Sequence, residues 1–285
     1  MISSVASVIE LLSRSRPIEF VKAFEHGAGG TSLARLDGEL VVVKAWPWTP
    51  EREQILTTGL ANAMIMAERS VPIPGLLERG TIGAYSYLLY EFVDGAWPAR
   101  VDDSLAAQML ATIDLQRDAA PRANPDWPDA VASMITDGDP SLDLHPRRLR
   151  DRPVGEDILD LARAALDACD PGNLRRTDVV HGDFAPENLL VRDGRINAVV
   201  DWEQSRTGDV GFDLAGMIYD IEIGSKAGPE VLAALYREIE SRVPPDAWRL
   251  YTGIYAVRYA GWALGTEMEA DVLATIARVV APRNH

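Results

Sequence analysis

An acid, an amide and a second acid follow one another closely in the second half of this chain. Asp183 ends a His-Gly-Asp triplet, Asn188 follows five residues later, and Asp201 opens an Asp-Trp-Glu triplet. Asn188 and Asp201 offer the oxygen ligands that a hard cation such as Mg²⁺ requires. A carboxylate at position 183 could accept the proton of an attacking hydroxyl group while the cation screens phosphates. The pattern therefore indicates phosphoryl transfer.

A predicted hairpin connects the amide to the second acid. Residues 189–192 and 195–200 are β-rich and are separated by Asp-Gly, which is typical of a two-residue turn. With this turn as the loop, Asn188 pairs with Val199, and Asp201 lies two residues beyond that partner. Side chains alternate with period two, so Asn188 and Asp201 share a face. Diagonal neighbours lie about 7–8 Å apart, so we expect both side chains to reach one ion.

Each piece of this pattern also has an ordinary structural explanation. The spacing Asp-x-x-x-x-Asn occurs by chance, Asp-Gly hairpins are common on surfaces, and Asp201 alone could cap a helix. The joint occurrence of His-Gly-Asp, Asn188, the hairpin and Asp-Trp-Glu is much rarer than any single piece. We therefore interpret the set as one site.

These residues resemble the aminoglycoside phosphotransferase family, a relative of the choline kinases and more distantly of protein kinases. The matching segments are Val-Val-His-Gly-Asp at 179–183, Asn-Leu-Leu-Val at 188–191, Val-Val-Asp-Trp-Glu at 199–203 and Gly-Asp-Val-Gly-Phe-Asp-Leu-Ala at 208–215. The resemblance implies an α+β, two-lobed protein-kinase-like fold over residues 20–265. Such a fold has a small N-terminal antiparallel sheet plus one helix, and a larger, mainly helical C-terminal lobe.

The resemblance also implies roles for single residues. Asp183 would be the catalytic acid/base, and Asn188 and Asp201 would hold Mg²⁺. Asp213 would brace the catalytic loop by hydrogen bonding to its backbone. A helix N-cap is the alternative role for Asp213, and both roles are compatible.

The amino-terminal third predicts a small antiparallel sheet with a glycine-rich loop. The loop lies between β-rich runs at 20–25 and 32–36 and contains Gly27, Gly29 and Gly30. Glycines there would let backbone N–H groups approach phosphates, and they would bind the nucleotide. The same glycine pattern also marks ordinary tight turns, so the motif alone is weak.

Lys44 is a stronger candidate for nucleotide binding. It is one of three lysines against twenty-five arginines, and it ends the next β-rich run, 39–44. In kinases, the lysine that binds the α- and β-phosphates lies at this position. The alternative is that Lys44 lies on an edge strand and protects it against aggregation. Kinases pair this lysine with a glutamate on the next helix, but residues 59–62 read Gly-Leu-Ala-Asn. We favour Glu53 as the partner, and the alternative is that the pair is absent.

A hinge between two lobes is expected near residues 91–95. Strands are predicted at 76–82 and 86–92, and the backbone groups of Glu91 and Val93 would then face the nucleotide base. An ordinary exit from a strand into a loop explains the same residues. We expect residues 1–95 to form the nucleotide-binding lobe and residues 96–285 the catalytic and acceptor-binding lobe.

The second lobe reads as mainly helical. Helices are predicted at 103–119, 156–168, 230–243 and 248–264. Many charges and prolines between residues 124 and 153 predict a mobile insertion on the acceptor side rather than core. Arg258, Trp262 and residues 267–269 are candidates for the acceptor cleft, whereas buried packing of Trp262 and solvated glutamates are the commoner alternatives.

Composition excludes several classes of protein. The single cysteine, Cys169, excludes an internal disulfide and fits a reducing cytoplasm. Residues 1–12 predict an amphipathic helix rather than an export signal, because they lack a basic leader and contain Glu10. No apolar run approaches the length of a membrane span, so we expect a cytoplasmic protein without membrane contact.

The net charge and its distribution indicate which binding partners to expect. The net charge of −15 argues against a nucleic-acid partner. Residues 1–95 carry 8 Lys/Arg and 11 Asp/Glu, and residues 96–285 carry 20 and 32. A negative cleft in the second part would attract a cationic acceptor, such as an amino sugar or amino alcohol. Acidic surfaces also aid solubility, so charge alone does not select an acceptor.

The sequence therefore predicts a Mg²⁺-dependent phosphotransferase that uses ATP or GTP and a small hydroxyl-bearing acceptor. The resemblance favours an aminoglycoside-like antibiotic, and hence a role in antibiotic resistance. A metabolic kinase for an amino alcohol, sugar or amino acid is the second hypothesis. A nucleotide-binding pseudokinase is the third, because the lysine's partner is displaced. The choice between ATP and GTP and the oligomeric state stay open.

Overall fold

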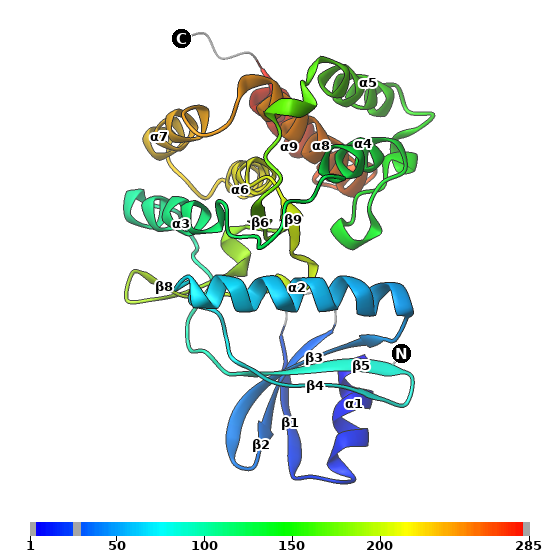
Figure 1. Ribbon diagram of the computed structural model, residues 1–285, viewed down its shortest axis with the longest axis vertical. Helices are drawn as coiled ribbons and strands as arrows, with labels where there is room; N and C mark the ends of the chain where they lie inside the picture. The colour runs from blue at the N-terminus through cyan, green and yellow to red at the C-terminus, as the bar shows by residue number, and fades with distance from the viewer. Residues whose placement is uncertain (1–3, 25–29, 282–285) are drawn as a thin grey trace.

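A computed structural model describes residues 4–24 and 30–281 of the chain. An antiparallel sheet forms one end of the molecule and a mainly helical part forms the other, with helix α2 lying between them (Figure 1). The predicted α+β architecture with two lobes is confirmed.

The sheet has five antiparallel strands in the order β1-β2-β3-β5-β4. All five lie where β-rich runs predict them, with ends that differ by a few residues. Their bounds are β1 (Ile18–Ala23), β2 (Thr31–Leu36), β3 (Glu39–Pro47), β4 (Leu76–Ile82) and β5 (Tyr85–Glu91).

Helix α1 (Ser4–Ser13) covers one face of this sheet, as the amphipathic pattern predicts. Val5, Val8, Ile9 and Leu12 recur at helical spacing and are almost completely buried against strand residues such as Val43. This contact forms the core of the smaller lobe.

Helix α2 (Pro50–Glu68) connects the two lobes through its two halves. Its first turn starts at Thr49, whose side chain accepts a hydrogen bond from the Arg52 amide. Leu56 and Leu60 pack on the sheet, whereas Met66 belongs to the core of the larger lobe. The helix therefore fixes the sheet relative to the larger lobe.

The larger lobe is built around a core of buried aromatic side chains. Phe212 contacts Tyr251 and Tyr255, and Tyr219 stacks near Tyr255. The lobe's α-helices are α3 (Asp103–Gln116), α4 (Trp127–Thr136), α5 (Pro153–Ala168), α6 (Gly211–Ile223), α7 (Pro229–Glu240), α8 (Pro245–Ala263) and α9 (Glu269–Val280). The four helices predicted from periodicity correspond to α3, α5, α7 and α8.

The prediction of a mobile insertion at residues 124–153 is wrong. This segment contains α4 and two short helices, η1 (Pro140–Leu142) and η2 (Pro146–Leu149), and it contributes to the core. Trp127 is completely buried, and its indole N–H donates to the Tyr251 hydroxyl at 3.0 Å. Pro128, Pro140 and Pro146 lie in the first turns of these helices, where no backbone N–H is lost, so they start helices rather than break them.

Two small β-ribbons belong to the larger lobe and adjoin the residues of the predicted site. One pairs β6 (Asp178–Val180) with β9 (Arg206–Gly208), and the other pairs β7 (Leu189–Arg192) with β8 (Arg195–Val199). Short helices η3 (Pro171–Asn173), η4 (Pro186–Asn188) and η5 (Trp202–Gln204) adjoin them. Within the described residues, every helix is too short or too polar to cross a membrane.

Candidate active site

Asp213 fixes the loop that carries Asp183, as the resemblance implies. Its completely buried carboxylate accepts hydrogen bonds from the backbone N–H groups of His181, at 2.7 Å, and Gly182, at 2.8 Å. Val210 occupies the N-cap of α6, and Asp213 lies in the first turn. Burial raises the pKa of Asp213, although these donors and the nearby His181 favour its charged form.

Gln116 completes this brace, and the sequence analysis did not identify its role. Its buried amide donates to Asp213 at 2.7 Å and to the Val179 carbonyl at 3.0 Å. Gln116 is a polar residue on the apolar stripe of α3, and that mismatch is the sequence signal that could have revealed it. The loop that carries Asp183 is therefore held from α3 and α6 together.

His181 links the loop to the segment that precedes Asp201. Its Nε2 lies 2.8 Å from the Val200 carbonyl, and its Nδ1 accepts the Asp183 amide at 3.2 Å. These partners require the tautomer with hydrogen on Nε2. The buried ring also packs edge-on against Trp202, with centroids 4.6 Å apart. His181 thus has a structural task.

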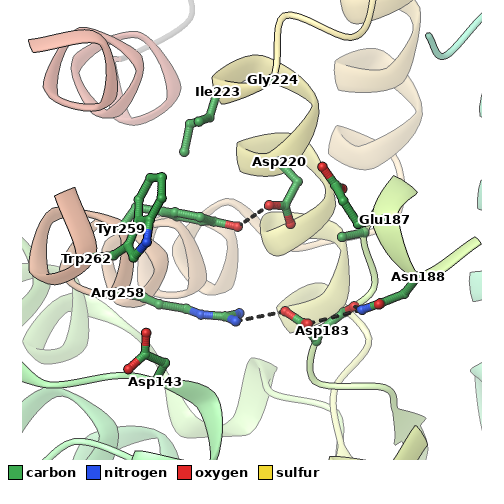
Figure 2. Close-up of a pocket in the computed structure, with 11 residues that line it drawn as sticks. Asp143, Asp183, Glu187, Asn188, Asp220, Ile223, Gly224, Arg258, Tyr259 and Trp262 are labelled. Atoms are coloured by element: carbon green, nitrogen blue, oxygen red, sulfur yellow. Dashed lines mark hydrogen bonds and ion pairs between the residues drawn. The ribbon is translucent and has the colours of Figure 1, made fainter. Parts of the chain in front are cut away.

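The Asp183 carboxylate is oriented by one donor on each oxygen. Arg258 donates to Oδ1 at 2.8 Å and Asn188 Nδ2 donates to Oδ2 at 3.1 Å, as Figure 2 shows. The same Asn188 nitrogen donates to the Asp183 carbonyl at 2.7 Å. The Asp183 side chain is 39% exposed, so it remains accessible from the cavity.

The hairpin forms as predicted, but its register differs by one residue. Beyond the turn the pairing shifts between Leu190 and Val191, so Leu189 rather than Asn188 lies opposite Val199. The cause is a β-bulge at Asn197, whose side chain donates to the Asp94 carbonyl at 2.7 Å. The predicted pairing of Asn188 with Val199 is therefore wrong, and the Asn188 carbonyl accepts the Val200 amide.

Asp201 compensates for this shift by adopting the left-handed conformation, with φ 69° and ψ 39°. Aspartate tolerates this region better than most residues. The turn brings the Asp201 carboxylate to Lys44, with Oδ1 2.5 Å from Nζ. Asp201 therefore points toward Lys44 on the sheet rather than continuing the alternation of a strand.

Lys44 contacts a second carboxylate, that of Glu203, at 2.7 Å. Burial opposes the charged form of Lys44, but the charges of Asp201 and Glu203 outweigh burial and raise its pKa above the usual value. Burial likewise acts against ionised Asp201, and Lys44 outweighs it, so the pKa of Asp201 is lowered. Lys44, Asp201 and Glu203 therefore form one cluster of ion pairs.

The predicted pair between Lys44 and Glu53 is not the arrangement in the structure. Glu53 binds Arg79 at 2.6 Å and the Ser86 hydroxyl, on the first turn of α2. The helix places Glu53 near the far end of strands β4 and β5, and Glu203 occupies the position beside Lys44. Glu203 could not be recognised as the partner from the sequence, because it follows the hairpin and lies 159 residues from Lys44.

The other nucleotide-binding candidates are only partly described. Gly27 and Gly29 lie outside the described residues, and the Gly30 carbonyl accepts the Ala45 amide at 2.9 Å. The Glu91 amide donates to the Gly75 carbonyl, so this N–H is already paired. Contacts from Gly30, the Glu91 carbonyl and Val93 to a nucleotide stay predictions.

A cavity of about 390 Å³ opens beside Asp183 (Figure 2). Two predicted residues of the acceptor cleft line it: Arg258 and Trp262. Trp262 is 47% exposed, so the alternative of buried packing is wrong. Glu269 instead accepts the Gly265 amide at the start of α9. The acids that line the cavity are Asp143, Asp183, Glu187 and Asp220.

Asp220 is a member of this cavity that the sequence analysis missed. It accepts the Tyr259 hydroxyl at 2.6 Å. Burial, followed by the charge of Asp183, raises the pKa of Asp220 to about 7. An acid within an otherwise apolar stretch of α6 is the signal that could have revealed it.

The donor set of Asn188 and Asp201 is compatible with Mg²⁺. The Asn188 nitrogen is used by the catalytic loop, which leaves its side-chain oxygen as the potential ligand. Asp201 is 49% exposed and uses Oδ1 for Lys44. In phosphate-binding proteins, Mg²⁺ is usually coordinated by oxygen atoms of one or two short side chains together with the phosphate oxygens.

Comparison with known proteins identifies the family. Residues 21–251 match the model of the phosphotransferase enzyme family, so the chain belongs to that family and is a phosphotransferase. The family resemblance and the enzyme class predicted from the sequence are confirmed. No curated protein sequence matches the chain significantly.

Solved structures of antibiotic phosphotransferases share the fold. A thermostable D198A mutant of aminoglycoside phosphotransferase APH(4)-Ia, in a ternary complex with ADP and hygromycin B, has TM-score 0.67 and 16% identity, over 96% of this chain and 98% of that one. Aminoglycoside-3'-phosphotransferase of type VIII has TM-score 0.61 and 20% identity, over 88% and 99%. Macrolide 2'-phosphotransferase MphH from Brachybacterium faecium has TM-score 0.58 and 19% identity, over 98% and 99%.

Proposed function

We propose that this chain is a Mg²⁺-dependent nucleoside-triphosphate O-phosphotransferase whose acceptor is a small, hydroxyl-bearing, aminoglycoside-like antibiotic. The observation that carries the proposal is that Asp183 lines an acidic cavity and accepts a hydrogen bond from Asn188. Nucleotide and acceptor would thus meet at one carboxylate.

Asp183 would receive the proton of the acceptor hydroxyl. Its two oxygens each accept one hydrogen bond, which leaves lone pairs for a third donor. Arg258 and Asn188 hold the carboxylate in one orientation, so the hydroxyl would be aligned before transfer. Phosphoryl transfer depends mainly on such positioning and on charge neutralisation.

Lys44 would bind the nucleotide phosphates, with ATP or GTP as the donor. Asn188 and Asp201 would hold Mg²⁺, which neutralises charge on the phosphates when it is bound. Gly27, Gly29 and Gly30 would approach the phosphates, and Glu91 and Val93 would face the base at a hinge near residues 91–95. The division into lobes at 1–95 and 96–285 belongs to this proposal.

A cationic acceptor is supported by the chemistry of the cavity. Asp143, Glu187 and Asp220 line it together with Asp183, and Trp262 offers an exposed aromatic face. Carboxylates recognise amino groups, and an aromatic face suits the apolar side of a sugar ring. The similar structures include a complex with hygromycin B, a complex with spectinomycin and a macrolide 2'-phosphotransferase, which supports antibiotics as the first compounds to test.

Acceptor-stimulated release of nucleoside diphosphate tests this proposal. The intact protein would be incubated with Mg²⁺ and ATP or GTP, and with a panel of aminoglycosides, spectinomycin and macrolides. We expect at least one aminoglycoside to raise diphosphate release well above the rate with water alone. Stimulation by amino alcohols, sugars or amino acids only would instead support a metabolic kinase. Nucleotide binding without turnover by any compound would support the pseudokinase hypothesis.

A further inference from the structure

The two carboxylates that contact Lys44 have different surroundings. Asp201 is 49% exposed and reaches the lysine with one oxygen. Glu203 is only 15% exposed, and its Oε1 lies 2.7 Å from Lys44 Nζ and accepts the Tyr90 hydroxyl at 3.0 Å. Glu203 is therefore held on two sides, whereas Asp201 keeps an open side.

Helix α2 cannot supply a glutamate to this site. Residues 56–63 contain no acid. A Cβ atom on Gly59 would lie 2.4 Å from the Glu203 carbonyl oxygen and 2.6 Å from that of Trp202. The helix surface and the backbone of η5 are thus in direct contact, and no longer side chain fits between them.

From these contacts we infer that Glu203 positions Lys44 in place of a glutamate on helix α2. The inference rests on the proposed function, because it treats Lys44 as the group that binds nucleotide phosphates. Close packing of η5 on Gly59 brings Glu203 to the lysine, and Tyr90 on β5 fixes the carboxylate from the sheet side. When Asp201 turns to a cation, Glu203 keeps the charged amino group in place.

On this inference, Glu203 positions Lys44, whereas Asp201 binds the cation, and the two roles can be separated by experiment. Loss of Asp201 should raise the Mg²⁺ concentration that nucleotide binding requires, because a ligand is removed. Loss of Glu203 should weaken nucleotide binding at every Mg²⁺ concentration, because only the lysine is misplaced. The dependence on Mg²⁺ therefore distinguishes loss of a metal ligand from loss of the residue that positions Lys44, and the coupling between Glu203 and Lys44 is the readout that a merely structural role would not reproduce.

Calorimetric titration of the full chain with Mg²⁺ and AMP-PNP provides the test. We expect Glu203→Gln to weaken AMP-PNP binding about tenfold, since hydrogen bonds to charged groups contribute at this level. Half-saturating Mg²⁺ should stay unchanged in Glu203→Gln and should rise in Asp201→Asn. Tyr90→Phe keeps the ring and removes the hydroxyl, so we expect a smaller loss of about two- to threefold.

A double-mutant cycle tests the coupling directly. In a Lys44→Met background, Glu203→Gln should weaken binding little further, because the two residues act together. Glu78→Gln is the matched control. Glu78 binds Arg16 at 2.5 Å and accepts the Tyr87 hydroxyl, in a similar cluster of the same sheet. This control should lower the thermal midpoint and leave AMP-PNP affinity unchanged.

The possible failures are distinguishable. Parent-like affinity of Glu203→Gln, or a shift of its Mg²⁺ requirement like that of Asp201→Asn, overturns the inference about Glu203. A large loss in Glu53→Gln without one in Glu203→Gln also overturns it. A parent protein that does not bind AMP-PNP, or a Lys44→Met variant that binds like the parent, overturns the proposed function instead.

Discussion

Asp183 takes its orientation from groups that lie far apart in the chain. Asn188 is five residues away, whereas Arg258 comes from α8 and is partly buried beside the cavity. Burial opposes the charge of Arg258, but Asp183 more than offsets burial and raises its pKa. The arginine therefore stays charged and holds the Asp183 carboxylate in one orientation.

Asp183→Ala should abolish phosphoryl transfer and leave nucleotide binding largely intact. General acid–base groups contribute about 10²–10⁴-fold to rate, and this residue faces the acceptor cavity rather than the Lys44 cluster. Diphosphate release with the best acceptor measures the first effect, and titration with Mg²⁺ and AMP-PNP measures the second. Activity equal to that of the parent would refute the assignment.

Asp220 should make the stability of the protein depend on pH. Its folded pKa of about 7 lies above the value of about 3.9 for an unfolded aspartate. The favourable contribution of the protonated group is complete below pH 4 and is lost as the pH rises to 7. Asp220→Asn should therefore raise the thermal midpoint at pH 8 by about 2–4 °C, and by less at pH 5.

The same substitution should impair the binding of a cationic acceptor. At pH 8 the ionised Asp220 would attract an amino group, so Asp220→Asn should raise the KM of an amino acceptor several-fold, with KM for nucleotide unchanged. Steady-state kinetics between pH 6 and 8 measures this effect. A difference in thermal midpoint that is the same at pH 5 and pH 8 would contradict the pKa on which both predictions depend.

At the scale of elements, the contact between α2 and η5 determines what the cleft contains. Gly59 is the point of contact, and its missing side chain lets the η5 backbone approach. A glycine inside a helix ordinarily costs about 0.5–1 kcal/mol relative to alanine. Here the close approach outweighs that cost.

Gly59→Ala should therefore destabilise the protein instead of stabilising it. The new methyl group would overlap the Glu203 carbonyl, and η5 would have to move. We expect a lower thermal midpoint together with weaker AMP-PNP binding. Thr58→Ala, at an exposed position of the same helix, is the control and should leave both quantities near the parent values. A higher midpoint in Gly59→Ala would show that the contact is loose.

Periodicity and turn chemistry were sufficient to predict the elements that carry the site. The strands around Lys44, the Asp-Gly hairpin and helix α8 could be predicted because their signals are local. The bulge at Asn197 could not, since it depends on a hydrogen bond to Asp94, about a hundred residues away in sequence. The partner of Lys44 could not be predicted either, because it depends on how closely α2 packs against η5.

At the scale of the whole molecule, residues 96–285 carry most of the excess acid, and the proposed acceptor cavity lies among these residues. The net charge is −15, and four acids line the cavity beside Asp183. Clefts with one sign of charge raise the local concentration of oppositely charged ligands, and salt screens the effect. The charge distribution therefore bears on the choice of acceptor and on its rate of binding.

Raising the ionic strength from about 50 mM to about 300 mM should raise the KM of a polycationic acceptor several-fold. A neutral hydroxyl-bearing acceptor is the control, and its KM should change little. Steady-state kinetics at fixed pH and saturating nucleotide measures both. Equal salt dependence for the two acceptors would show that cavity charge does not select the substrate.

Both acidic partners of Lys44 belong to the segment that follows the hairpin, while the lysine itself is on the sheet. The sheet and the helical part are consequently joined at the place where phosphates would be held. Any separation of the two lobes must break these ion pairs. If the lobes separate when the nucleoside diphosphate dissociates, product release would require breaking the ion pairs of Lys44 with Asp201 and Glu203. The turnover rate would then depend on the strength of these ion pairs.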